Sequence, residues 1–321
     1  MSDRIRDRRT GLAGSELLAR FGGLAVFAAM IAFFSIDAPD TFPTLDNART
    51  ILDQAALLLI LGAGLTVVLI IGQFDLSFAA TIGLTGAVSA IASAQWDSPA
   101  WLAVLRAIGV GALVGVANGL AVAYGKAPAF IVTLAAGSVV TGLERLLTSD
   151  NPVTDLRIDY LELTTRRILT LSSATIVALL LVAVVWVLVR YTTYGRAIKA
   201  IGSNATAARL AGLTVQRSTV YGFMLMGACA GLASVIIVSR ASQHFPDSGS
   251  GLLLAPYTAA FLGAAATGRG RFGPWSTLFG ALFIGTLTTG LTIIDSPPWL
   301  TVFVQGLVLL VAVLVTRREQ S

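Results

Sequence analysis

The chain has 321 residues, of which 55% are hydrophobic and 12% charged, with a mean hydropathy of +0.82 and a formal net charge of +5. Soluble globular domains carry about 25% charged residues, so this composition excludes a soluble domain and indicates a chain that lies mostly in a bilayer. The excess cations fall in tails and loops, where they orient the chain in the membrane, and they do not indicate a nucleic-acid partner.

A basic tail, residues 1–20, precedes the first apolar segment, and no cleavage signal follows that segment. We therefore expect an uncleaved first span. Apolar stretches of about 20 residues recur along the chain, which predicts one membrane domain over residues 21–315. The sequence predicts an all-α polytopic membrane protein with about ten transmembrane helices, at residues 21–36, 50–72, 78–93, 102–124, 129–147, 168–189, 218–239, 252–267, 274–294 and 299–315.

Cations concentrate in alternate loops, and the positive-inside rule assigns such loops to the cytoplasm. This rule predicts that the basic tail 1–20 and the short tail 316–321 are both cytoplasmic, as an even number of spans requires. The largest outer loop then covers residues 148–167. Ten spans also allow an inverted repeat of five plus five, a form common in transporters.

The longest polar interruption, residues 190–217, contains five cations and no acidic residue, so we expect it on the cytoplasmic face. Within it, Asn204 to Leu210 is predicted to be a short helix, with Asn204 as N-cap, Arg209 in the last turn and Gly212 beyond the end. Two interpretations stay open at this point: a solvated loop between helices, or a docking helix for a cytoplasmic partner.

Chemistry within this chain has little support from the sequence. No G-x-x-x-x-G-K-[ST] phosphate-binding motif occurs, which argues against nucleotide hydrolysis. One histidine and one cysteine are too few for a metal site, and Cys229 lies in an apolar segment where it should pack as a small apolar residue. We expect neither enzyme activity nor a bound cofactor. Only Asp75 and Glu144 are acids near membrane depth, so the energy for transport should come from elsewhere.

Asp75 precedes Ser77 at the start of the third span, where a carboxylate can accept hydrogen bonds from free backbone N–H groups. It is either a cap that holds a re-entrant hairpin or a polar point on the solute route. Glu144, with its neighbour Arg145, and also Arg106 are expected either to extend towards the outer interface or to pair with each other's neighbours. His244 is expected to be an ordinary exposed loop residue.

Small residues recur at helical spacing in two spans, at Gly111, Gly115 and Gly119 and at Gly227 and Gly231, which predicts close helix packing. Asn118 lies beside the first set and needs a hydrogen-bond partner. A group of hydroxyl side chains would suit an uncharged, hydroxyl-rich solute if it lined one cavity: Thr66, Thr81, Thr85, Ser89, Thr133, Ser138, Thr141, Thr286, Thr288 and Thr289.

Four stretches together resemble the permease subunits of bacterial ABC importers for simple sugars, the ribose, galactose, arabinose and autoinducer-2 group. The family motifs are G-M-T-x-V-I-x-x-G-G-I-D-L-S, V-N-G-L followed by P-x-F-I-V-T-L, and G-R-x-x-x-A-x-G-x-N followed by A-A-R-x-x-G. The matching residues here are 64–77, 115–120 with 128–134, 195–204 with 207–212, and 270–273 with 280–285 near the last helices.

The resemblance implies an inner-membrane permease that pairs with a second permease chain, identical or different. It also implies a cytoplasmic ATPase that binds ATP and Mg²⁺ and a periplasmic solute-binding protein. The ATPase would dock on the motif residues Gly195, Arg196, Ala197, Gly202, Asn204, Ala207, Ala208, Arg209, Leu210 and Gly212. The solute route would include Gln73, Phe74, Asp75, Ser77, Asn118, Phe130 and Thr133.

Three departures from the family pattern bear mainly on the solute. Gln73-Phe74 replaces the usual Gly-Ile, Ala205-Thr206 replaces an acidic position, and residues 262–267 replace a G-G-T-S-type run. The predicted function is import of a small neutral solute, a monosaccharide or polyol. The alternatives are a related importer of branched-chain amino acids or nucleosides, or a stand-alone carrier, which would not need the coupling segment.

Overall fold

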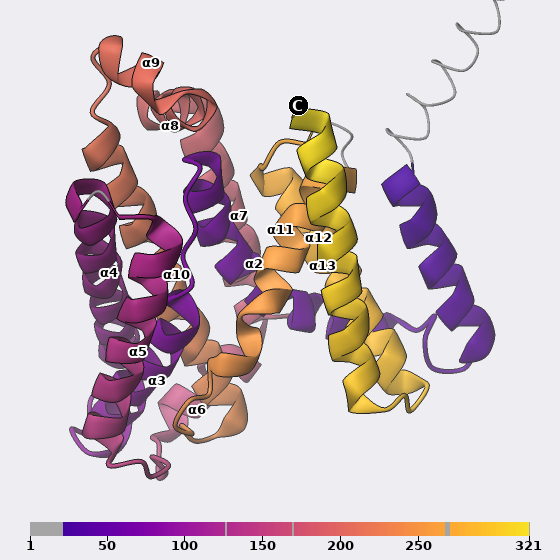
Figure 1. The fold of residues 1–321 in the computed structure, drawn as a ribbon. Coiled ribbons are helices and arrows are strands. Elements are labelled where there is room, and N and C mark those ends of the chain that lie inside the picture. The colour runs from indigo at the N-terminus through magenta and orange to yellow at the C-terminus, as the bar shows by residue number, and fades with distance from the viewer. Residues whose placement is uncertain (1–21, 126, 169, 267–269, 321) are drawn as a thin grey trace, which may run out of the picture.

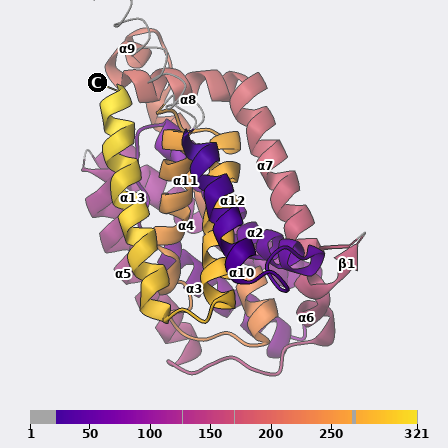
Figure 2. The ribbon, with the colours of Figure 1, turned by 90° about the vertical axis from the view of Figure 1, so that its right-hand side faces the viewer.

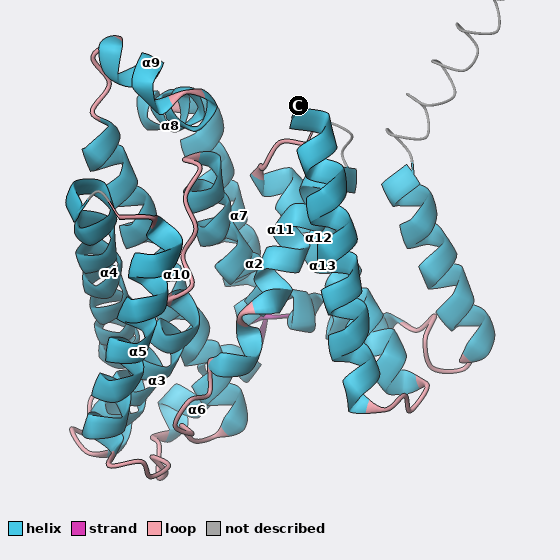
Figure 3. Ribbon diagram, in the orientation of Figure 1, coloured by secondary structure: helices cyan, strands magenta, loops and turns pink. Residues whose placement is uncertain are grey.

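The structure is a computed structural model that describes residues 22–125, 127–168, 170–266 and 270–320. The predicted tail 1–20 lies outside the described residues. Helices account for most of the described chain, as Figure 3 shows, with one short hairpin of strands beside them. The protein is an all-α polytopic membrane protein.

Figure 1 shows the elements in space. After a first helix at Gly22–Asp37, they are α2 (Leu45–Ile70), α3 (Phe78–Ala94), α4 (Ala100–Gly125), α5 (Ala129–Thr148), α6 (Ile158–Thr165), β1 (Arg167–Ile168), β2 (Leu171–Ser172), α7 (Ser173–Tyr191), α8 (Thr193–Ser203), α9 (Ala205–Leu210), α10 (Val215–Ala241), the 3₁₀ turn η1 (Ser250–Leu252), α11 (Leu254–Ala266), α12 (Pro274–Ile293) and α13 (Pro298–Gln320).

Within the described part of the chain, seven helices are long and apolar enough to cross a membrane: α2, α4, α5, α7, α10, α12 and α13. Three shorter apolar helices accompany them, the first helix, α3, and α11 with η1. Each coincides with one of the predicted apolar segments. The last helix continues past its predicted end at residue 315 to Gln320.

Helices α2 and α10 form the centre of the bundle and are the most deeply buried of the long helices. Both are apolar on all faces, as a helix enclosed by others should be. Helix α4 packs along α10, and α12 packs along α2. Helices α5 and α13 are the most exposed long helices, which leaves their apolar faces for lipid or for another chain.

Glycines allow α4 and α10 to approach backbone to backbone. A Cβ atom at Gly111 would overlap the carbonyl oxygen of Gly227, and one at Gly115 would overlap that of Phe223. Gly119 faces Val220, and Gly231 faces Ala107. The spacing of these glycines in both helices lets each turn interlock with the next, the geometry that small residues permit in membrane helix pairs.

The two ends of the bundle differ. Helices α8 and α9 lie across one end, which also holds the end of α13, whereas α6 lies at the other (Figures 1 and 2). We call these the α8–α9 end and the α6 end. Neither α6 nor α8 was predicted from the sequence. Helix α8 has a visible signal, because its buried residues Gly195, Ile198 and Ile201 recur at a helical spacing of three.

Glu144 does not extend to the outer interface, and the expectation that His244 is an exposed loop residue is wrong. Both side chains are fully buried, with relative exposures of 0%. Glu144 Oε1 accepts a hydrogen bond of 2.9 Å from the Asp247 N–H and lies 3.2 Å from His244 Nε2. Gly83 and Gly86 of α3 provide the space, because a Cβ at either would press on Glu144 or on His244. The sequence could not show this, since the two residues are 100 positions apart.

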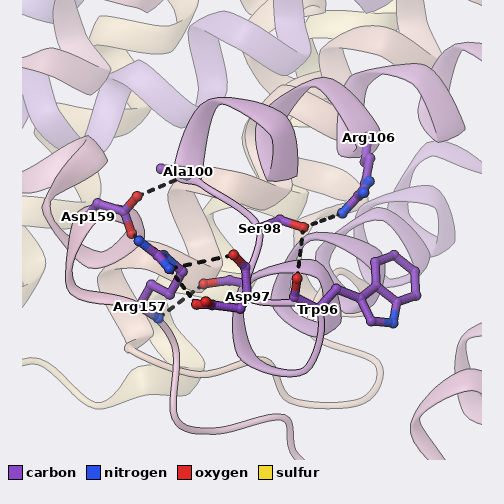
Figure 4. A network of polar contacts seen from close by, with 8 residues as sticks. Trp96, Asp97, Ser98, Ala100, Arg106, Arg157 and Asp159 are labelled. Carbon is purple, nitrogen blue, oxygen red and sulfur yellow. Dashed lines mark hydrogen bonds and ion pairs between the residues drawn. The ribbon is translucent and has the colours of Figure 1, made fainter.

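A polar network fastens the α6 end, as Figure 4 shows. Arg157 forms ion pairs with Asp97 and Asp159, and Asp159 accepts a hydrogen bond of 3.1 Å from the Ala100 N–H. That backbone bond lowers the pKa of Asp159, and the Arg157 guanidinium lowers it further. Arg106 donates to the Ser98 hydroxyl at 2.6 Å, near the loop at which it was expected. The network ties the α3–α4 loop to α6.

Candidate functional site

A cavity of about 1220 Å³ opens between the end of α2, helix α8, and helices α11 and α13. This volume is somewhat above the range of about 300–1,000 Å³ that is usual for small-molecule pockets. Its walls are apolar and aromatic, with a few polar groups. The lining residues are Leu69, Ile70, Gly72, Gln73, Phe74, Leu76, Lys199, Gly202, Ser203, Tyr257, Phe261, Gly270, Arg271, Phe272, Leu309, Val313 and Thr316.

One wall of the cavity is an unwound segment, Gly72–Ser77, which joins α2 to α3. Gly72 has a φ of +84°, a conformation that favours glycine, and it turns the chain back into the bundle. Figure 3 shows the non-helical chain running from the end of α2 down the middle of the bundle. Because it lies beside membrane helices, its backbone groups need partners within the protein or in a water-filled cavity.

The side chains of Asp75 and Tyr257 provide hydrogen-bond partners for backbone groups of this segment. Asp75 Oδ1 accepts hydrogen bonds from the Ser77 N–H at 2.8 Å and from the Ser77 hydroxyl at 2.5 Å, and so caps the start of α3. The Tyr257 hydroxyl accepts from the Asp75 N–H at 3.1 Å and donates to the Asp75 carbonyl at 2.8 Å. One α11 side chain therefore pairs both backbone groups of a residue in the unwound segment.

Neighbouring helices complete the support. Thr133 of α5 accepts a hydrogen bond of 3.0 Å from the Leu76 N–H, and Asn118 of α4 donates to the Ser77 hydroxyl at 2.6 Å. The structure thus brings Asp75, Ser77, Asn118 and Thr133 together as one buried network. None of the four lines the cavity, and the network holds the wall in place.

Of the three remaining residues predicted for the solute route, two line the cavity and one does not. Gln73 and Phe74 both line the cavity, and the Phe74 side chain is 43% exposed. Phe130 is exposed on α5 and is not among the lining residues. The hydroxyl side chains singled out in the spans do not line the cavity either, and Thr66, Thr81, Thr85 and Ser89 bond back to carbonyls of their own helix.

Four aromatic side chains, those of Phe74, Tyr257, Phe261 and Phe272, form part of the lining. Phe74 stacks near Tyr257 and Phe261, with centroid distances of 6.1 and 6.5 Å and interplanar angles of 24° and 14°. Phe261 also meets Phe272 edge to face at 5.0 Å. The sequence analysis missed Tyr257 and Phe261. Their spacing of four in a short apolar segment put them on one helix face, but no pattern indicated that this face meets residues 73–77.

Residues 190–217, the predicted coupling segment, form two helices between α7 and α10. The Thr192 hydroxyl caps α8 by accepting from the Gly195 N–H at 3.1 Å, and the Asn204 side chain caps α9 by accepting from the Ala207 N–H at 2.9 Å. Gly212, with a φ of +83°, ends the turn after α9. The short helix predicted from Asn204 to Leu210 is therefore present.

Helix α8 is fixed to the bundle on the cavity side. A Cβ atom at Gly202 would overlap the carbonyl oxygen of Ile70, so α8 lies directly against the end of α2. Lys199 Nζ donates to the Val189 carbonyl at 2.8 Å, and the Tyr194 hydroxyl donates to the Ser218 carbonyl at 3.1 Å. Burial, and then the charge of Arg190, lower the pKa of Lys199.

Helix α9, in contrast to α8, has nearly all of its side chains exposed. Ala208 is buried, whereas Leu210 is 87% exposed, and the other exposed members of the predicted docking set in α9 are Ala207 and Arg209. On α8, Arg196 is exposed and Gly195 is buried against the Leu188 carbonyl. The segment therefore presents a cationic face with one prominent apolar side chain, away from the bundle.

A sequence profile described as "Branched-chain amino acid transport system / permease component" matches residues 47–313, which include the cavity wall and the coupling segment. The chain belongs to this permease family.

Curated relatives of this permease match it over nearly its whole length. It is 32% identical to the ribose import permease protein of Haemophilus influenzae, over 89% of each chain. The ribose import permease protein of Bacillus subtilis is 32% identical, over 95% of this chain and 94% of its own. The D-allose transport system permease protein of Escherichia coli is 26% identical, over 93% and 91%. No solved structure matches this chain.

The described part of the permease contains no group of three or more His, Cys, Asp or Glu side chains that could hold a metal ion. The polar side chains that line its cavity, among them Gln73, Lys199 and Arg271, can form hydrogen bonds or charge contacts. The arrangement thus combines a lined cavity, a supported unwound wall, and a surface helix in contact with that wall.

Proposed function

We propose that the protein is the membrane-spanning permease of an ATP-driven importer for a neutral monosaccharide. The observation that carries this proposal is the similarity, over about nine-tenths of the chain, to permeases named for ribose and D-allose import. The cavity supports it, because Gln73 and aromatic rings line it. Of the two cations in the lining, Lys199 belongs to α8 and Arg271 to the loop between α11 and α12.

In this proposal a separate ATPase binds ATP and Mg²⁺ and docks on the exposed face of α8 and α9. The α8–α9 end is then cytoplasmic, as are both termini, in agreement with the positive-inside rule. Gly202 supports a direct mechanical link, since α8 touches α2 immediately before Gly72 turns into the unwound segment. Motion of the docked helix would reach the cavity wall through one contact, as in rigid-body switching.

The α6 end would then face the periplasm and receive the solute-loaded binding protein. The ion pairs of Arg157 with Asp97 and Asp159 would give that surface a fixed shape. A second permease chain would cover part of the exposed apolar faces of α5 and α13. The result is a multi-pass protein of the bacterial inner membrane.

We also propose ten spans arranged as five plus five. The first helix and α2–α5 would correspond in order to α7 and α10–α13. Packing supports this order, because α4 on α10 mirrors α12 on α2, and α3 on α5 mirrors α11 on α13. The third member of each half is short: α3 has 17 residues and α11 has 13. Five spans per half give the halves opposite orientations.

The test is reconstitution of the permease in liposomes with its cognate ATPase and binding protein. We expect uptake of a labelled monosaccharide that needs ATP, the ATPase and the binding protein together. Ala207→Glu and Arg209→Glu should abolish uptake and co-purification of the ATPase, because they place acidic groups on the docking face, whereas Thr154→Glu at the α6 end should leave co-purification intact.

Two outcomes would overturn the proposal. Uptake driven by the permease without the ATPase would make it a stand-alone carrier. Delivery of a branched-chain amino acid or nucleoside, with no monosaccharide moved, would retain the importer and reject the solute.

A further inference from the structure

The unwound segment has hydrogen-bonding groups that the protein leaves open. Tyr257 pairs both backbone groups of Asp75, Thr133 pairs the Leu76 N–H, and the Gln73 N–H donates to the Val68 carbonyl at 3.0 Å. Among the described residues, no hydrogen bond is made by the Phe74 N–H or to the carbonyl oxygens of Gln73 and Phe74. These three groups belong to the two residues of the segment that follow Gly72 in the cavity lining.

Open backbone groups at this depth are costly unless water or a ligand satisfies them. The depth follows from the helix alongside: Tyr257, which contacts Asp75 and stacks near Phe74, lies nine residues before the end of α11, or about 14 Å inside it. Unwound backbone beside a cavity is the form that substrate and ion sites take in other membrane transporters.

The segment also lies at the meeting point of the two short helices. Asp75 precedes α3, and Tyr257 stands four residues into α11, the helices that occupy the third place in the two proposed halves. Their contact is the pair of Tyr257–Asp75 hydrogen bonds. Short or interrupted spans at corresponding positions are the feature that most directly indicates a binding site in repeat-built transporters.

The aromatic rings give the site a second kind of contact. Phe74 exposes its ring to the cavity, and Phe261 lies nearly parallel to it at an interplanar angle of 14°. The faces of such rings carry partial negative charge and attract the weakly positive C–H groups on the flat faces of a sugar ring. Peptide groups and the Gln73 amide, by contrast, suit its hydroxyl groups.

We propose that the segment Gln73–Phe74, with Phe261 of α11, is the contact site for the transported sugar. Its open peptide groups and the Gln73 amide bind hydroxyls, and the two rings bind the apolar face. Asp75, Ser77, Asn118, Thr133 and Tyr257 act as positioning residues that fix this wall. The site rests on the proposed function, which supplies its substrate class, uncharged monosaccharides. Among the lining residues that the structure describes there is no carboxylate to bind a cation, and the two cations, Lys199 and Arg271, are not part of the Gln73–Phe74–Phe261 contact set.

The experiment uses the reconstituted importer, with D-ribose, D-allose and D-fructose as labelled probes. It measures two quantities for each variant: sugar imported, and ATP hydrolysed in response to loaded binding protein. Phe74→Ala and Phe261→Ala should lower import at saturating sugar by roughly two- to tenfold, the factor expected for an aromatic contact. Stimulated ATP hydrolysis should change less, so that fewer sugars cross per ATP. Phe74→Trp should retain import.

Phe33→Ala is the matched control, because Phe33 is an exposed ring on the first helix, outside the cavity lining and away from the faces proposed for the second permease chain. It should behave like the unchanged protein. Should Phe74→Ala fail to assemble, Phe74→Leu carries the same test, since it retains apolar volume without a ring. Equal import per ATP in the Phe74, Phe261 and Phe33 variants, beside an active unchanged importer, would overturn the site and leave the proposed function standing. An unchanged importer that moves no monosaccharide would instead reject the proposed function.

Discussion

At the scale of single residues, two buried side chains pair backbone groups that lie outside regular helices. Tyr257 pairs the N–H and the carbonyl of Asp75, and Glu144 pairs the N–H of Asp247. Both side chains join segments more than 100 positions apart in sequence. Composition shows that such groups are rare in this chain, but it does not show which backbone group each one reaches.

Glu144 gives a prediction at this scale. Glu144→Ala leaves the Asp247 N–H unpaired and removes the carboxylate beside His244, which should cost about 1–3 kcal/mol of stability. The neighbouring Arg145→Ala is the control, because Arg145 is half exposed and forms only a surface ion pair of 3.4 Å with Asp150. Thermal unfolding of the purified protein in detergent measures both. Equal melting temperatures for the two variants would show that the buried contact contributes little.

At the scale of elements, the sequence predicted those features that depend on local pattern. Ten apolar segments were found by hydrophobicity and length, and the α9 helix by its Asn204 cap and Gly212 end. What it could not give depends on contacts between distant segments. Residues 73–77 fall between the predicted spans 50–72 and 78–93, but the contact of Asp75 with Tyr257 joins them to a helix 182 positions later in the sequence.

The α4–α10 pair gives a prediction at the element scale. Gly111→Val should prevent close packing, since any side chain there meets the Gly227 carbonyl, and the variant should be recovered in low yield or melt at a lower temperature. Gly109→Val, two residues away on the same helix, meets nothing within 4 Å and should be tolerated. Size-exclusion chromatography and thermal unfolding of the two proteins decide the matter, and similar behaviour would contradict the packing argument.

At the scale of the whole molecule, the proposed mechanism gives the two ends of the bundle different functions. The α8–α9 end carries the exposed docking face and touches the cavity wall through Gly202, while the α6 end is tied together by Arg157 and its carboxylate partners. Transport would then depend on orientation as well as on contacts. The docking face must lie in the cytoplasm for an ATPase to reach it.

Cysteine labelling tests that claim most directly, because the natural sequence has one cysteine, Cys229, which is buried. Leu210→Cys on α9 should react with a membrane-impermeant maleimide in inside-out vesicles, should be protected when the ATPase is bound, and should not react in spheroplasts. Thr154→Cys at the α6 end should react only in spheroplasts. Labelling of the Leu210→Cys protein from the outside, or no protection by the ATPase, would contradict the account.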